Sequence, residues 1–131
     1  IPEYAMIGDG EMIFKPFVLN NLYTQVLSFL NVNTDIEVRK YGFRDACSRL
    51  VEVAEKLSLP TGYNMVCTEK QTSVDGKAAA FSGTLKQNGN KLMVDTRLSL
   101  NKRIYTAADW KEYRESVNAY KSYGEYIVIR K

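Results

Sequence analysis

The sequence contains no histidine, and this absence excludes more chemistry than any other. Without an imidazole the chain cannot form the Ser-His or Cys-His pairs that activate a nucleophile, and it has no histidine to offer a metal. It also lacks the side chain that most often acts as a general base near neutral pH. We therefore expect no catalytic residue in this chain, and we predict that it is not an enzyme in its own right.

Cysteine is scarce as well, because Cys47 and Cys67 are the only two. Two cysteines are too few for a disulfide framework. They can form one bridge in an oxidising compartment, or they can remain free thiols, which is the commoner fate of an isolated pair. Arg44 and Arg49 near Cys47 would favour its thiolate, but no base is at hand, so a structural thiol is the expected role.

Long apolar runs and a strong charge of one sign are also missing. No run reaches the roughly 18–20 apolar residues that cross a bilayer, so we predict no membrane span. The formal net charge is only +3, and the lysines and arginines are spread along the chain. The composition therefore gives no support for nucleic-acid binding.

The rest of the composition is ordinary for a globular protein. The chain has 131 residues, of which 45% are hydrophobic and 25% charged, so we expect a single domain over 1–131 with one modest core. It starts at Ile1 and carries no signal peptide. We expect it to be an excised or processed piece of a larger protein.

Two short turns predict β-hairpins. Asp9-Gly10 in "YAMIGDGEMIFKPF" predicts the first, pairing Ile7 with Met12 and Ala5 with Phe14, with Pro16 ending the second strand. Asn88-Gly89 predicts the second, within 78–100. If that dipeptide is the centre of the turn, the pairs are Leu85 with Leu92, Gly83 with Val94, Phe81 with Thr96 and Ala79 with Leu98.

The segments between the hairpins are less clear. Residues 20–34 have helical spacing flanked by asparagines, which indicates a short helix inside a long connection or a loop. Residues 35–41 have the pattern of a short strand. Residues 46–63 fit either a helix that uses Leu50, Ala54 and Leu57, or a strand followed by a Pro-Thr-Gly turn and another strand. The strand places Val51, Val53, Leu57 and Leu59 on one face with Glu55 as the exception.

A helix is predicted from 107 to about 121. Thr106 and Asp109 have the spacing of a capping box, and Tyr105 and Trp110 that of a hydrophobic staple. Gly124 suits the helix end, and "EYIVIRK" predicts a last strand. The expected fold is therefore mostly β, an antiparallel sheet or sandwich with one helix near the C-terminus packed on it.

Three stretches resemble one family. "LSLPTGYNMV", "NGNKLMVDTRLSLNKRIYTAADWKEYRESV" and "YIVIRK" are similar to the C-terminal domain of bacterial transglutaminase-like proteins, which are regarded as cysteine proteases. "GDGEMIFKPF" resembles the entry into that domain, and the resemblance covers about 4–17 and 38–131. The resemblance favours a strand rather than a helix for residues 49–59.

The resemblance implies a non-catalytic accessory domain that follows an upstream catalytic core, its partner in the same polypeptide. The catalytic Cys, His and Asp of the family belong to that core, and no residue of this chain matches them. The resemblance also implies an exported protein, periplasmic or associated with the cell envelope.

Several short patterns contain residue types that occur in metal or catalytic sites. Gly8-Asp9-Gly10-Glu11 has too few oxygen ligands at fixed spacing for calcium, so we expect a turn and no metal or other cofactor. The pairs Asp35 with Glu37 and Ser99 with Lys102 are expected to be solvated rather than catalytic.

The late aromatic residues are the one concentration of side chains able to hold a ligand. We expect Trp110, Tyr113 and Tyr120 on the buried face of the helix, and Tyr123 and Tyr126 to be exposed ligand or partner contacts. The alternative to an accessory domain is an independent carbohydrate- or peptide-binding module that uses exposed aromatic rings.

Overall fold

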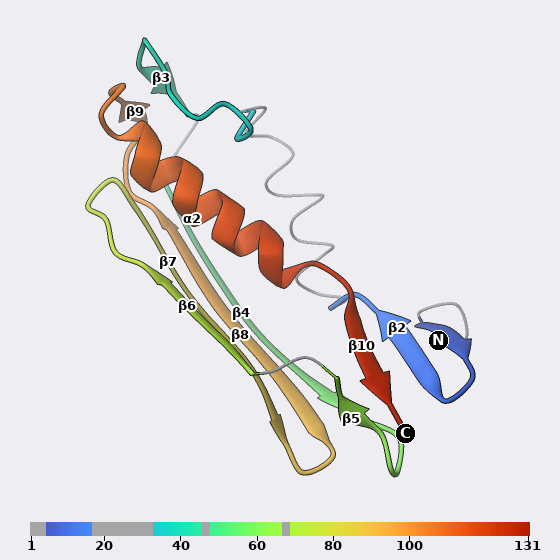
Figure 1. Cartoon of the computed structure of the whole chain (residues 1–131). Coiled ribbons are helices and arrows are strands. Elements are labelled where there is room, and N and C mark those ends of the chain that lie inside the picture. The colour runs from blue at the N-terminus through green and yellow to red at the C-terminus, as the bar shows by residue number, and fades with distance from the viewer. Residues whose placement is uncertain (1–4, 17–32, 46–47, 67–68) are drawn as a thin grey trace.

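Two antiparallel sheets, one two-stranded ribbon and one helix make up the part of the chain that the structure describes (Figure 1). The computed structural model describes residues 5–16, 33–45, 48–66 and 69–131. Its elements are β1 (Ala5–Gly8), β2 (Glu11–Phe14), β3 (Phe43–Arg44), β4 (Arg49–Ser58), β5 (Asn64–Met65), β6 (Lys70–Val74), β7 (Ala79–Asn88), β8 (Lys91–Leu100), β9 (Ile104–Tyr105), α2 (Trp110–Tyr123) and β10 (Ile127–Arg130).

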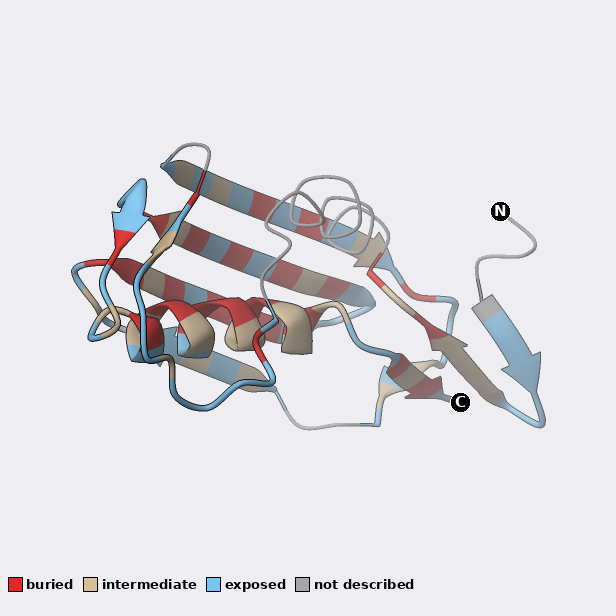
Figure 2. Cartoon of the chain, turned by 90° about the horizontal axis from the view of Figure 1, so that it is seen from above, coloured by how far each residue is buried: buried red, intermediate tan, exposed pale blue. Residues whose placement is uncertain are grey.

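The main sheet has the order β4-β8-β7-β6, and α2 lies across one of its faces. Buried and exposed residues alternate along its strands, because successive side chains of a strand point to opposite faces (Figure 2). The predicted class is confirmed: the fold is mostly antiparallel β with one helix near the C-terminus. The sheets are open, and the layer that covers the main sheet is α2 rather than a second sheet.

The β7–β8 hairpin forms, but the predicted register is wrong by two residues. Leu85 pairs with Val94, Gly83 with Thr96, Phe81 with Leu98 and Ala79 with Leu100. The turn is centred on Gly89-Asn90, since Asn88 pairs with Lys91 and Gly89 has a φ of 61°. Asparagine tolerates left-handed backbone better than other non-glycine residues, so it can follow glycine in such a turn.

The second sheet, called the small sheet below, has the order β1-β2-β10-β5. The predicted β1–β2 register is confirmed, with Ile7 opposite Met12 and Ala5 opposite Phe14. The predicted last strand also forms, and β10 joins β2 so that Ile127 lies opposite Phe14. The Gln87 side chain ties the small sheet to β7, because its oxygen accepts a hydrogen bond from the Met65 N–H at 2.7 Å.

The segment 46–63 contains a long strand, as the family resemblance favours. Along β4, Val53 and the following Leu59 are buried, and Glu55 is buried among them as the expected exception. The chain then turns at Pro60–Tyr63, where the Tyr63 N–H donates to the Pro60 carbonyl at 3.1 Å and Gly62 has a φ of 86°. The segment 20–34 lies almost wholly outside the described residues, as do Cys47 and Cys67.

The strand predicted at 35–41 is wrong. This segment lies along α2 and is held by side chains of the helix: the Trp110 indole donates to the Ile36 carbonyl at 2.9 Å, and Arg114 donates to the Thr34 carbonyl at 2.8 Å. The carbonyls of Thr34 and Ile36 therefore bond to side chains of the helix instead of to a neighbouring strand.

The two hydrogen bonds of the predicted capping box form in the turn before α2, but the predicted N-cap is wrong, because the N-cap of the helix is Asp109 rather than Thr106. The Thr106 N–H donates to the Asp109 carboxylate at 2.9 Å, and the Asp109 N–H lies 3.3 Å from the Thr106 hydroxyl oxygen. Regular helix begins at Trp110, three residues later than expected, after a turn at 107–109, and it extends to Tyr123. As predicted, the aromatic side chains of Trp110, Tyr113 and Tyr120 are buried against the sheet.

Candidate functional site

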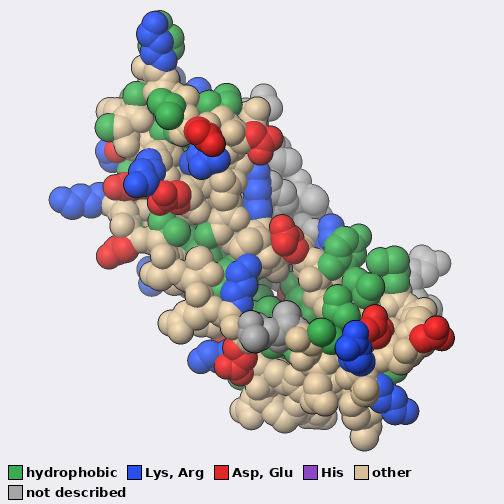
Figure 3. Space-filling model, viewed as in Figure 1, with side chains coloured by type: hydrophobic (Ala, Val, Ile, Leu, Met, Phe, Trp, Pro, Cys, Tyr) green, Lys and Arg blue, Asp and Glu red, His purple; other side chains and the backbone are tan. Residues whose placement is uncertain are grey.

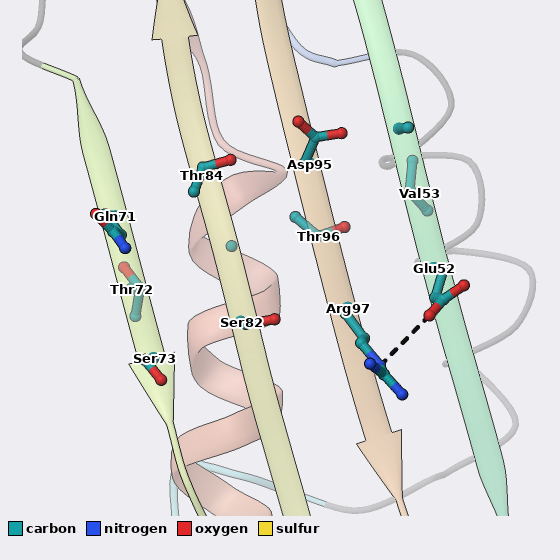
Figure 4. Close-up of a pocket in the computed structure, with 12 residues that line it drawn as sticks. Glu52, Val53, Gln71, Thr72, Ser73, Ser82, Thr84, Asp95, Thr96 and Arg97 are labelled. Carbon is teal, nitrogen blue, oxygen red and sulfur yellow. Dashed lines mark ion pairs between the residues drawn. The ribbon is translucent and has the colours of Figure 1, made fainter.

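The outer face of the main sheet, opposite α2, carries a polar groove of about 440 Å³. Its floor is built from outward-pointing residues of all four strands, which the register aligns in rows: Ser73, Ser82, Arg97 and Glu52 form one row, and Gln71, Thr84, Asp95 and Ala54 the next (Figure 4). We call this surface the sheet groove. A neighbouring hollow of about 260 Å³ extends it toward Ser99 and Asp75.

The charges of the sheet groove pair across β8 and β4. Arg97 Nε lies 3.3 Å from Glu52 Oε1, and both side chains are largely exposed. An ion pair this exposed adds little stability, because water screens it. The remaining lining residues are mainly short hydroxyl and amide side chains, with no aromatic ring among them. The groove can therefore hydrogen-bond a polar chain, but it cannot stack a sugar ring.

A second hollow of about 300 Å³, the helix-end cleft, lies where α2 ends and β10 begins. Both predicted contact residues line it, together with Glu69, Lys70, Leu85, Ser122, Glu125 and Ile127. Lys70 donates to the Ser122 hydroxyl at 2.9 Å, and its ammonium lies 4.5 Å from the centre of the Tyr123 ring.

The two predicted contact residues differ in exposure. Tyr126 is exposed, at 60% of its surface, as expected. The expected exposure of Tyr123 is wrong: the side chain is buried, and its hydroxyl donates to the Gly83 carbonyl at 2.8 Å. Tyr126 therefore stays a predicted contact, whereas Tyr123 holds α2 on the sheet.

Two of the other sequence patterns take part in local structure. Gly8 to Glu11 make the turn of the first hairpin. The Ser99 hydroxyl donates to Asn101, and the Lys102 ammonium pairs with Asp109 at 3.0 Å, so each side chain is engaged elsewhere. Within the described ranges, no group of three or more His, Cys, Asp and Glu side chains is placed to hold a metal ion.

Sequence reasoning missed a buried ion pair beside the aromatic core. Arg49 Nη2 lies 3.2 Å from Asp45 Oδ1, with 5% of the Asp45 side chain exposed. The rings of Phe43, Tyr105 and Tyr113 lie about this corner, with Phe43 stacked on Tyr105 at 4.8 Å. Burial, chiefly, raises the pKa of the Tyr105 and Tyr113 hydroxyls above the usual value, and the charge of Asp45 adds to the rise. The i,i+4 spacing of Asp45 and Arg49 was visible in the sequence, but their burial was not.

The fold and these hollows define a small antiparallel β domain with one covering helix and a polar outer face. Residues 10–129 match the family described as "Domain of Unknown Function with solved-structure structure (DUF3858)". The match covers most of the chain, and the chain belongs to this family.

A solved structure has a similar fold. It is the crystal structure of a "putative protease" from Parabacteroides distasonis ATCC 8503, with a TM-score of 0.73 and 17% sequence identity over 94% of this chain. The match takes up 24% of that protein, so this chain spans about a quarter of its length. At this identity the likeness shows the fold alone. No curated protein matches the sequence.

No helix in the described part of the chain is both long and apolar enough to cross a bilayer.

Proposed function

We propose that this chain is a non-catalytic accessory domain of a larger transglutaminase-like protein of the cysteine-protease class, and that it packs against an upstream catalytic core. One observation carries the proposal: nearly the whole chain, 94%, superimposes on a quarter of a protein described as a "putative protease". A domain that occupies so small a share of such a protein leaves room for a separate catalytic core.

The chemistry of the chain supports the non-catalytic part of the proposal. The sequence has no histidine to activate a thiol or hydroxyl, and the sheet groove offers serine and threonine hydroxyls beside an exposed Arg97–Glu52 pair. Such a surface can hold a polar segment by hydrogen bonds, but it has no imidazole to activate a hydroxyl as the histidine of a Ser-His pair does.

The test combines gene sequence and activity. The coding sequence upstream of Ile1 should encode a core with catalytic Cys, His and Asp, and the isolated chain should show neither peptidase nor transglutaminase turnover. Reproducible turnover that is lost in Cys47→Ala and kept in the matched Cys67→Ala would overturn the non-catalytic role. An upstream region without such a core would overturn the assignment to this class of protein.

The alternative, a carbohydrate- or peptide-binding module with a row of exposed aromatic rings, has less support. Trp110, Tyr113, Tyr120 and Tyr123 are all buried. Among the described residues that line the helix-end cleft, Tyr126 supplies the one exposed ring, and one ring does not make a stacking platform.

Export is part of the same proposal. We propose that the parent protein is periplasmic or bound to the cell envelope, and fractionation of cells that express the complete gene tests this.

A further inference from the structure

The small sheet carries apolar side chains on both faces. Phe14, Ile127 and Ile129 lie on its inner face and are buried in the core. Because side chains alternate along a strand, Ile13 and Val128 point to the outer face, where they lie opposite each other. The register adds one neighbour on each side: Met6 pairs with Ile13, and the Val66 N–H donates to the Val128 carbonyl at 3.0 Å.

These four side chains, Met6, Ile13, Val128 and Val66, form one line across β1, β2, β10 and the end of β5, which we call the apolar row. Met6 is 60% exposed and Val66 48%, while Ile13 and Val128 are half-buried. Figure 3 shows hydrophobic side chains gathered over β2 and β10 on this side of the molecule.

The outer faces of the two sheets differ in polarity. A free face of an antiparallel sheet is normally polar, and the outer face of the main sheet follows that rule with serine, threonine and charged residues. Apolar residues on both faces are the pattern of a sheet that is covered on both sides. The apolar row therefore calls for a covering layer.

The borders of the apolar row have the composition of a protein interface. At one side the Lys15 ammonium lies 4.6 Å from the centre of the exposed Tyr126 ring. At the other side Arg130 and Glu11 form an ion pair between β10 and β2. An apolar centre with an aromatic residue and a charged rim is typical of surfaces that bind another folded protein.

The β1 edge of the small sheet has no partner strand among the described residues. Within the described residues β1 pairs with β2 alone, and its sequence AMIG contains no charge and no proline. Exposed edges are usually shielded by charged residues or proline, because a bare edge pairs readily with another strand.

We propose that the apolar row and the β1 edge are the surface by which this domain docks on a neighbouring domain of the same polypeptide. This rests on the proposed function and names the contact that it requires. A domain that fills a quarter of a longer protein has most of that protein as an available neighbour. Both β1 and β10 belong to the small sheet, so a domain joined through either strand would be tethered beside this surface.

The test compares hydrogen exchange in two proteins: the 131-residue chain and the complete polypeptide that contains it. We expect the amides of β1 and β10 to exchange about tenfold or more slowly in the complete polypeptide, while those of β9, at the opposite end of the molecule, are unchanged (Figure 1). Met6→Glu should abolish the added protection. Ile104→Glu is the matched control, because Ile104 on β9 is 71% exposed and also apolar.

Equal exchange in the two proteins would overturn the docking surface and leave the proposed function standing, provided that the isolated chain is inactive and an upstream core is encoded. A dimer of the 131-residue chain in sedimentation, dissociated by Met6→Glu but not by Ile104→Glu, would also overturn it, since the occupant would then be a second copy. A complete polypeptide that contains no catalytic core would contradict the proposed function itself.

Discussion

Two buried tyrosines differ in what their hydroxyls do. Tyr123 donates a hydrogen bond to the Gly83 carbonyl, whereas no partner lies within reach of the buried Tyr113 hydroxyl among the described residues. We expect Tyr123→Phe to lower the free energy of unfolding by about 1 kcal/mol, because the hydrogen bond is lost. We expect Tyr113→Phe to change it little or to raise it by up to about 1 kcal/mol, because an unsatisfied polar group is removed. Urea unfolding of the two variants tests this, and a larger loss for Tyr113→Phe would contradict it.

Asp109 should make the start of α2 sensitive to acid. The hydrogen bond from the Thr106 N–H, and next that from Lys102, hold the pKa of the Asp109 carboxyl below its usual value. A lowered pKa in the folded state means that the carboxylate stabilises the fold above about pH 4, and that this stability is lost as the pH falls further.

The corresponding variant is Asp109→Ala. We expect it to cost about 1 kcal/mol at neutral pH, because the hydrogen bonds from Thr106 and Lys102 are lost, and to cost less as the pH falls below the usual range of a carboxyl, about 4. Denaturant titrations at several pH values measure this difference. Asp95→Ala, on the exposed outer face of the main sheet, is the control and should cost less than about 0.5 kcal/mol at every pH. A cost for Asp109→Ala that did not change with pH would contradict the role of its charge.

Tyr123 is buried rather than exposed because α2 ends later than the sequence predicts. The helix was expected to end near 121, which would leave Tyr123 in the following loop. The helix in fact continues to Tyr123, and the spacing of three from Tyr120 then places both rings on the buried face. Helix ends are the least certain part of a sequence prediction, and a residue in the last turn changes its burial with them.

At the scale of elements, Gly83 allows α2 to lie close to β7. A Cβ at this position would lie 2.7 Å from Phe81 Cζ and 2.8 Å from Tyr123 Cζ, so both rings would have to move. We expect Gly83→Ala to destabilise the protein by about 1–3 kcal/mol through overpacking. Gly8→Ala is the control, because a Cβ there meets nothing within 4 Å. Thermal unfolding of both variants tests the prediction, and equal melting temperatures would contradict it.

The β7–β8 hairpin shows how much a turn signal determines. Asn88-Gly89 located the hairpin, but the turn uses Gly89-Asn90, and every pair is shifted by two. Since side chains alternate with a period of two, this shift keeps each residue on its predicted face. The buried face from Phe81 to Leu100 could therefore be predicted, whereas the pairs could not, because two adjacent dipeptides both suit the turn.

The segment 35–41 shows the limit of local pattern. Its alternating residues predict a strand, but its Ile36 carbonyl, and that of Thr34 just before it, receive hydrogen bonds from Trp110 and Arg114 on a helix far along the sequence. Tertiary contacts override the weak strand propensity of so short a segment. Nothing within the segment itself could have indicated this partner.

At the scale of the whole molecule, the division into two sheets was not predictable. The hairpins were foreseen one by one, but β10 pairs with β2 from the start of the chain, and that long-range pairing creates the small sheet. The sheet groove was missed for a related reason. Its lining residues are ordinary polar residues on separate strands, and the register of four strands is needed to bring them together.

The buried tyrosines also set how the whole fold responds to alkali. Burial raises the pKa of Tyr120 to about 12, and it raises the pKa of Tyr105 and Tyr113 as well. A raised pKa in the folded state means that the fold keeps these protons more tightly than the unfolded chain does. The stability they contribute is therefore complete below about pH 10 and falls as the pH rises above it.

We expect these three tyrosines to ionise together with global unfolding, above about pH 10, rather than one at a time in the folded protein. Tyrosinate absorbance and near-ultraviolet circular dichroism, recorded in the same alkaline titration, should therefore share a late cooperative step. Tyr113→Phe should reduce the absorbance change of that step, since it removes one of the buried hydroxyls. A smooth absorbance change completed while the dichroism stays native would contradict the prediction, because it would mean that solvent reaches these hydroxyls without opening the contact between α2 and the main sheet.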